Sequence, residues 1–177
     1  SLIKIPLTPY ALIKNYNSTL LKALNLKKNL NYLNVYTFLV YGPGQKLDRF
    51  IPDIINKFLH NKTFLLKSPK YDRDFLYIED YTDIIFKFLK TKKINNMDIN
   101  IGSGKAVNLE KVAKNIFSKI KLGKLKISKI KLKNDGVNNL YPDLTKMKFL
   151  LKNWEPKYKL DDGLNLTIDY YKKLKWY

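Results

Sequence analysis

A tyrosine and a lysine near the beginning of the chain are spaced so that they could move a proton together. Tyr10 and Lys14 are four residues apart, and residues at this spacing lie on one face of an α-helix. A neighbouring ammonium group would lower the pKa of the Tyr10 phenol from about 10 toward neutrality. Such a phenol could act as a general acid or base on a substrate hydroxyl or carbonyl group.

The spacing alone is weak evidence, because tyrosine and lysine are both common in this chain. About two Tyr-x-x-x-Lys matches are expected by chance at this composition. Two occur, the second at Tyr171 and Lys175. A surface lysine one turn from a half-buried tyrosine therefore stays open as the alternative to a catalytic pair.

The elements that would position these residues alternate between helix and strand, which predicts an α/β fold. Thr8 and Pro9 predict a helix that runs to about Leu24, because a hydroxyl cap followed by proline is typical of a helix N-terminus. The apolar run 33–41 predicts a strand buried on both faces, ending at the turn 42–44. Further strands are expected at 63–66, 75–78, 98–101 and 124–132, and further helices near Pro52, Asp80, Asn108, Asp143 and Asp161, with Asp80 and Asn108 as caps.

Composition limits the class of protein. The 177 residues are 45% hydrophobic and 14% aromatic, which indicates one folded domain rather than a disordered chain. The chain has no cysteine and its single histidine is His60, so disulfides, thiolate metal sites and histidine clusters are excluded. No apolar run approaches a membrane span and nothing resembles a signal peptide, so we expect a soluble, cytoplasmic protein.

The net charge of +19 raises the question of nucleic-acid binding. All but two of the 34 cationic side chains are lysine, the exceptions being Arg49 and Arg73. Lysine, asparagine, isoleucine, tyrosine and phenylalanine are all abundant and all have AT-rich codons, so base composition explains the charge. A basic nucleic-acid-binding protein remains a minority alternative.

Five groups of residues stand in a characteristic order along the chain. They are Pro9-Tyr10-x-x-x-Lys14; Val40-Tyr41-Gly42-Pro43-Gly44-Gln45; Arg73-Asp74-Phe75 with Asp80; Asn100-Ile101-Gly102-Ser103-Gly104; and Asp143-Leu144-Thr145-Lys146 with Trp154-x-Pro156 and Asp162-Gly163-Leu164. This series resembles the C-terminal half of an extended short-chain dehydrogenase/reductase, specifically the NAD-dependent epimerase/dehydratase family acting on nucleotide-sugars. The resemblance covers nearly the whole chain. It implies the C-terminal part of a Rossmann-type doubly wound sheet plus a small α/β substrate-binding subdomain, with 1–177 as a single partial domain.

The resemblance implies a role for each candidate site residue. Tyr10 would be the catalytic acid/base at the sugar C4, and Lys14 would bind the nicotinamide ribose of NAD or NADP beside it. Arg73 would hold the diphosphate of a nucleotide-sugar, and Arg49 would lie in the loop that helps cover the nucleotide. The alternative for each arginine is a surface salt bridge. The turn 102–104 resembles a phosphate cradle, although a tight strand-to-helix turn is the preferred interpretation.

The chain also departs from the family pattern. The family often has arginine and asparagine where this chain has Tyr36 and Leu39, which leaves open a divergent subclass such as a 4-ketosugar reductase or a CDP-sugar enzyme. Tyr36 is expected to be a core aromatic with Tyr41 and Phe75. The glycine-rich turn that seats the cofactor pyrophosphate is absent. We therefore expect the isolated chain to lack dehydrogenase activity and to bind NAD(P) poorly, its cofactor-binding half lying elsewhere on a longer chain or on a separate polypeptide. A catalytically inactive nucleotide-binding remnant, a partner subunit and a homodimer stay open.

Overall fold

The computed structural model describes residues 8–91, 96–129, 139–152 and 154–174, and within them helices and strands alternate. The α/β class expected from the sequence is confirmed. The helices are α1 Pro9–Lys28, α2 Phe50–Leu59, α3 Ile78–Lys90, α4 Leu109–Ile120, α5 Thr145–Leu150 and α6 Leu160–Lys173. The strands are β1 Leu33–Thr37, β2 Leu39–Tyr41, β3 Thr63–Leu66, β4 Asp72–Tyr77, β5 Met97–Ile101, β6 Ala106–Asn108, β7 Lys124–Ile127 and β8 Asn139–Leu140.

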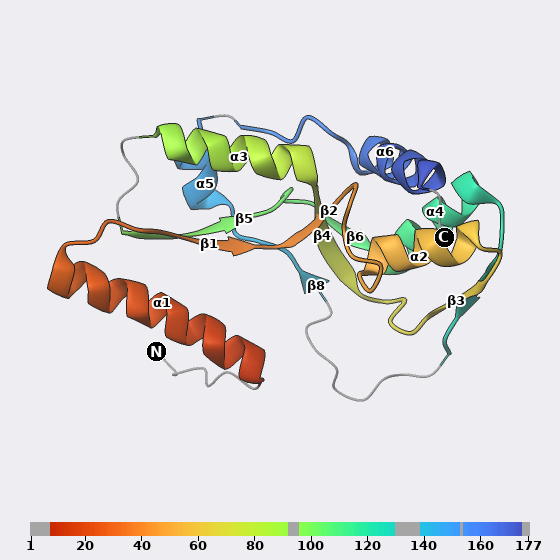
Figure 1. Ribbon diagram of the computed structural model, residues 1–177, viewed down its shortest axis with the longest axis horizontal. Helices are drawn as coiled ribbons and strands as arrows, with labels where there is room; N and C mark the ends of the chain where they lie inside the picture. Colours follow the sequence, from red (N-terminus) through yellow and green to blue (C-terminus); the bar gives the residue numbers. More distant parts are fainter. Residues whose placement is uncertain (1–7, 92–95, 130–138, 153, 175–177) are drawn as a thin grey trace.

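The strands form three hydrogen-bonded groups. β1 pairs with β5 and β3 pairs with β7, both in parallel. β4 is the centre of the third group, with β2 and β8 parallel to it and β6 antiparallel. α1 and α3 lie on opposite sides of the β1/β5 pair, whereas α2, α4 and α6 gather at the other end of the molecule (Figure 1). Two hydrophobic cores follow this division, one beneath α3 and α5 and one among α2, α4 and α6.

The prediction of a single strand at 33–41 is wrong, because the apolar run divides at Phe38 into β1 and β2. The Phe38 N–H donates to the Ile101 carbonyl at 3.0 Å. Before Phe38 the run pairs with β5, and after Phe38 it pairs with β4. The run is also not buried on both faces. Tyr36 is 40% exposed and Leu39 is 42% exposed, because both side chains face a cleft.

α1 begins where the sequence predicts. The Thr8 hydroxyl accepts the Ala11 N–H at 3.1 Å, which confirms the cap. The helix continues to Lys28, beyond the expected end at Leu24, and closes at Asn29 with a left-handed φ of 51°. An ion pair of 3.2 Å between Lys22 and Asp98 connects α1 to β5.

Asp80 is not the helix cap that the sequence suggests. α3 begins two residues earlier, and its N-terminal flanking residue is Tyr77, which makes no side-chain cap bond. The Asp80 carboxylate is buried and accepts the backbone N–H groups of Lys157 at 2.9 Å and Tyr158 at 3.2 Å. It therefore ties α3 to the segment that leads into α6. Asn108 is a cap as expected, since its side-chain oxygen accepts two N–H groups at the start of α4.

Other expected elements differ mainly at their ends. The last part of the strand expected at 124–132 lies outside the described residues, and β7 ends at Ile127. β6 and β8 were not expected from the sequence. Among the residues that the structure describes, no helix has the length and apolar composition needed to cross a membrane.

Candidate active site

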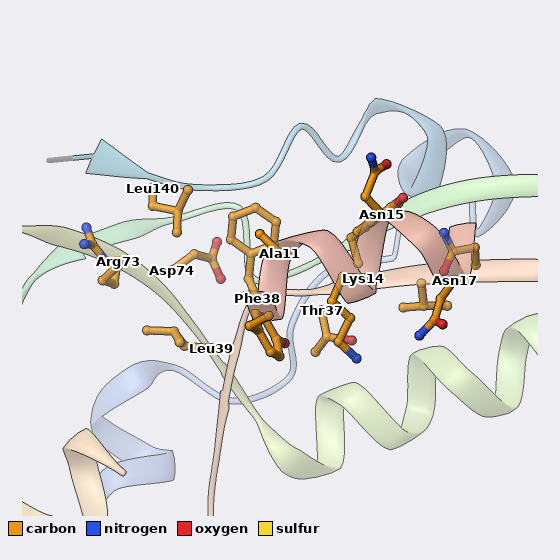
Figure 2. Close-up of a pocket in the computed structure, with 14 residues that line it drawn as sticks. Ala11, Lys14, Asn15, Asn17, Thr37, Phe38, Leu39, Arg73, Asp74 and Leu140 are labelled. Atoms are coloured by element: carbon orange, nitrogen blue, oxygen red, sulfur yellow. The ribbon is translucent and has the colours of Figure 1, made fainter. Parts of the chain in front are cut away.

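A cleft of about 610 Å³ lies between α1 and the strands β1, β2, β4 and β8. Its volume is in the range of small-molecule binding sites. Figure 2 shows Leu39, Arg73, Asp74 and Leu140 gathered at one end and Lys14, Asn15 and Asn17 at the other. The lining comprises Tyr10, Ala11, Lys14, Asn15 and Asn17 from α1, Asn34–Leu39 from β1 and β2, Arg73 and Asp74 from β4, and Leu140 from β8.

Tyr10 and Lys14 both face this cleft from the first turns of α1. The Lys14 Nζ lies 5.5 Å from the centroid of the Tyr10 ring, as expected for residues four apart on a helix. Tyr10 is 71% exposed, so most of this residue is accessible to solvent. The two groups are therefore adjacent and open to a ligand.

Arg73 lines the same cleft although it is far from Tyr10 in the sequence. It is half-buried on β4, where its Nη1 donates to the Asp72 carbonyl at 2.8 Å. Its guanidinium carbon lies 4.8 Å from the centroid of the Tyr71 ring, at cation–π distance. These contacts fix the orientation of the guanidinium at the edge of the cleft.

Arg49 does not belong to the lining of this cleft. It precedes α2, and its Nε lies 3.7 Å from Asp48 Oδ1, with both side chains exposed. The structure therefore brings Tyr10, Lys14 and Arg73 together and leaves Arg49 outside.

Asp74 follows Arg73 on β4, and its carboxylate lies in the turn 102–104, which was compared with a phosphate cradle. Its carboxylate is buried and accepts the N–H groups of Ser103 at 2.7 Å and Gly104 at 2.6 Å. Burial raises the pKa of the Asp74 carboxyl, and these hydrogen bonds oppose the shift. The turn leads from β5 to β6 rather than into a helix. It is therefore a turn between two strands, not the expected strand-to-helix turn. Its N–H groups bind a carboxylate of the protein itself, which argues against a phosphate cradle.

Several lining residues were not identified from the sequence as site residues. Tyr36 was expected in the core and instead lines the cleft, whereas Tyr41 and Phe75 are buried as expected. Leu39 could have been found, because it marks a departure from the family pattern. Leu140 carried no signal, since it lies on a two-residue strand. Within the described ranges, no three or more His, Asp or Glu side chains are grouped so that they could hold a metal ion.

Comparison with known proteins gives consistent matches over most of the chain. Residues 3–102 match the model of the NAD dependent epimerase/dehydratase family. UDP-glucuronate 4-epimerase of Thermodesulfobacterium geofontis is 28% identical over 173 residues, which is 97% of this chain and 52% of that protein. Human dTDP-D-glucose 4,6-dehydratase is 28% identical over 144 residues, 76% of this chain and 39% of that protein. The chain thus spans about half the length of the curated relatives it matches, or less.

Solved structures give the same result. Pal from Bacillus thuringiensis superimposes with a TM-score of 0.85 at 28% identity, over 97% of this chain and 55% of that one. UDP-glucose 4-epimerase from Thermotoga maritima, solved with UDP-glucose, gives a TM-score of 0.84 at 26% identity, over 96% and 55%. These matches confirm the expected likeness to part of a Rossmann-type epimerase/dehydratase. By its sequence and its fold, the chain belongs to the NAD-dependent epimerase/dehydratase family.

Proposed function

We propose that this chain forms the substrate-binding half of an NAD(P)-dependent nucleotide-sugar epimerase, dehydratase or 4-ketosugar reductase. The observation that carries the proposal is the shared cleft of Tyr10, Lys14 and Arg73. A phenol, an ammonium and a guanidinium from two distant segments face one space. These are the groups needed to move a proton at a sugar and to hold its phosphates.

In this proposal, Tyr10 exchanges a proton with the C4 hydroxyl or keto group of the sugar. Its exposure to the cleft leaves the phenol oxygen accessible to a substrate. The ammonium of Lys14, one helical turn away, stabilises the negative charge that develops on that oxygen. A phenylalanine at position 10 would keep the ring and remove the proton.

Arg73 holds the diphosphate of the nucleotide-sugar. A guanidinium can donate two parallel hydrogen bonds to one phosphate, which the point charge of a lysine does not reproduce. The choice of residue supports this role, because almost every other cation of the chain is lysine. The contacts with Asp72 and Tyr71 hold the guanidinium in place before a ligand arrives.

The end of the cleft around Lys14 fits the ribose of a nicotinamide cofactor, NAD or NADP. The Lys14 ammonium and the amides of Asn15 and Asn17 offer donors and acceptors suited to ribose hydroxyls. Lys14 would hold the ribose there, beside Tyr10. A bound nicotinamide would exchange the hydride with the sugar C4.

A partner surface is also part of the proposal, because α1 presents an apolar stripe to solvent. Leu12, Ile13, Tyr16 and Leu20 are each at least 43% exposed, and large apolar side chains grouped on one helix face indicate an interaction site. We infer that residues 1–177 form one partial domain whose stripe packs against a cofactor-binding half. Without that half, the chain lacks dehydrogenase activity and binds NAD(P) poorly. The alternative is that a second copy of the chain covers the stripe, and a doubled mass in sedimentation equilibrium would identify such a dimer.

The test is calorimetric titration of the chain with UDP-glucose, dTDP-glucose and the corresponding nucleoside diphosphates. Arg73→Ala should weaken binding by about 10- to 100-fold, the range for a hydrogen bond to a charged group. The loss should be the same with and without the sugar, because the contact is to the diphosphate. Arg49→Ala is the matched control, since it removes the same group outside the cleft, and should change affinity less than twofold.

Three results would contradict the proposal. The first is that none of these ligands binds the unaltered chain. The second is an equal loss for Arg49→Ala and Arg73→Ala, which would indicate a general effect of charge. The third is unchanged affinity of Arg73→Ala, which would leave the guanidinium as part of a surface interaction only.

A further inference from the structure

Two leucines flank Arg73 on one face of the sheet. Leu140 of β8 lies opposite Arg73, and Leu39 of β2 lies opposite Phe75, two residues farther along β4. Paired residues in neighbouring strands, and residues two apart on one strand, share a face of the sheet. Leu39, Arg73 and Leu140 therefore lie on one face, and all three line the cleft (Figure 2).

The two leucines also lie close together. β6 pairs with Asp72–Asp74 on one edge of β4, so β8, which pairs with the same segment, must use the other edge. β4 lies between β6 and β2 in the sheet, so β2 follows β8 along that edge. Leu39 and Leu140 therefore occupy neighbouring positions beside the guanidinium.

This arrangement favours an apolar group on the ligand beside Arg73. Both leucines are 42% exposed, so a ligand that covers them gains from removing them from water. Neither offers a hydrogen bond, and a sugar hydroxyl placed against them would lose its water without a replacement. Asp74, a polar side chain next to Arg73 in the lining, already accepts the N–H groups of Ser103 and Gly104.

We infer that the sugar of the bound nucleotide-sugar is a 6-deoxyhexose, whose methyl group lies against Leu39 and Leu140. The inference rests on the proposed function, in which Arg73 holds the diphosphate. The sugar is attached directly to the phosphate, so it lies within reach of the positions flanking Arg73, whereas the nucleobase is separated from them by the ribose. The methyl that replaces the hydroxymethyl group at C6 is the apolar group that such a hexose offers.

The experiment is calorimetric titration of the chain with two matched ligand pairs, UDP-glucose with UDP-6-deoxyglucose and dTDP-glucose with dTDP-6-deoxyglucose, and with UDP alone. The 6-deoxy member of a pair should bind roughly tenfold more tightly, the discrimination that one methyl or hydroxyl group gives in an apolar pocket. Leu39→Asn, which replaces an apolar side chain beside Arg73 with an amide, should bring the ratio close to one.

The matched control is Leu65→Asn, the same substitution on β3. Leu65 is 49% exposed and lies outside the cleft, so the ratio should stay at the value of the unaltered chain. Circular dichroism establishes that each variant folds. If Leu39→Asn does not fold, Leu140→Asn provides the same test from the neighbouring strand.

The outcomes separate this inference from the proposed function. Equal affinity within each pair, or a preference for the 6-hydroxyl, would overturn the 6-deoxyhexose and leave a nucleotide-sugar site intact. A ratio that Leu39→Asn leaves unchanged would also overturn it, because the leucine would then not contact the methyl group. If the unaltered chain binds neither UDP nor the sugars, the proposed function fails and the inference fails with it.

Discussion

Replacement of Asp80 by serine distinguishes the two roles that this residue could have. If Asp80 capped α3, serine would serve nearly as well, because serine and aspartate are comparable at the N-cap. In the structure, Asp80 instead accepts the backbone N–H groups of Lys157 and Tyr158 from a buried position. The shorter serine side chain has one oxygen and could not reach both groups.

The expected loss follows from these two bonds. A hydrogen bond to a charged group contributes about 1.5–3 kcal/mol. Because Lys157 is exposed, water can replace the lost hydrogen bond to its N–H group in the variant, which reduces the loss at that group. Asp80→Ser should therefore lower the free energy of unfolding by about 2–4 kcal/mol. For a chain of this length, that corresponds to a fall in Tm of about 4–16 °C.

The measurement is urea-induced unfolding followed by circular dichroism and tryptophan fluorescence. Asp169→Ser is the matched control, because Asp169 is exposed on α6 and has a loose ion pair of 3.9 Å with Lys172. It should change the free energy of unfolding by less than about 0.5 kcal/mol. A loss of that small size for Asp80→Ser as well would refute the connection between α3 and the segment before α6.

Two further predictions concern packing and pH. A Cβ at Gly163 would lie 2.2 Å from the Tyr41 hydroxyl. Gly163→Ala should therefore lower the free energy of unfolding by about 1–3 kcal/mol, although alanine has the better helix propensity. An unchanged urea midpoint would contradict this. Burial raises the pKa of the Asp74 carboxyl above the ordinary value of 3.8, so the native state binds its proton at higher pH than the unfolded chain does. The stability of the unaltered chain relative to Asp74→Asn should therefore fall as the pH rises from 3.8 through the raised pKa, and a difference that does not vary with pH would contradict this.

Local signals in the sequence were sufficient for the elements whose ends depend on neighbouring residues. Thr8 and Pro9 define the start of α1, and Asn108 defines the start of α4, because each cap interacts with residues two or three positions away. The break at Phe38 was not predictable in this way. The apolar run looks uniform, and its division depends on β5 and β4, which lie far along the chain.

The same distinction applies to the site. Tyr10 and Lys14 share a helix face, so their spacing alone predicted that they would be adjacent. Arg73 stood out as an arginine in a lysine-rich chain. By contrast, the partner of the Ser103 and Gly104 N–H groups is a carboxylate 29 and 30 residues away, and nothing local to the turn indicated it. The exposure of Leu39 and Leu140 likewise depends on which strands border β4.

In the proposed function Tyr10 moves a proton at the sugar, and turnover by a Tyr10→Phe variant tests this most directly. The assay uses the chain together with the cofactor-binding half that the proposal requires and the nucleotide-sugar that binds best, with Tyr170→Phe as the control. Tyr170 is exposed on α6 and lies outside both the cleft and the apolar stripe of α1. Tyr10→Phe should lower kcat by about 10²- to 10⁴-fold and leave nucleotide-sugar affinity within about twofold, whereas Tyr170→Phe should change neither. Turnover by Tyr10→Phe equal to that of Tyr170→Phe would contradict the proposed role of Tyr10.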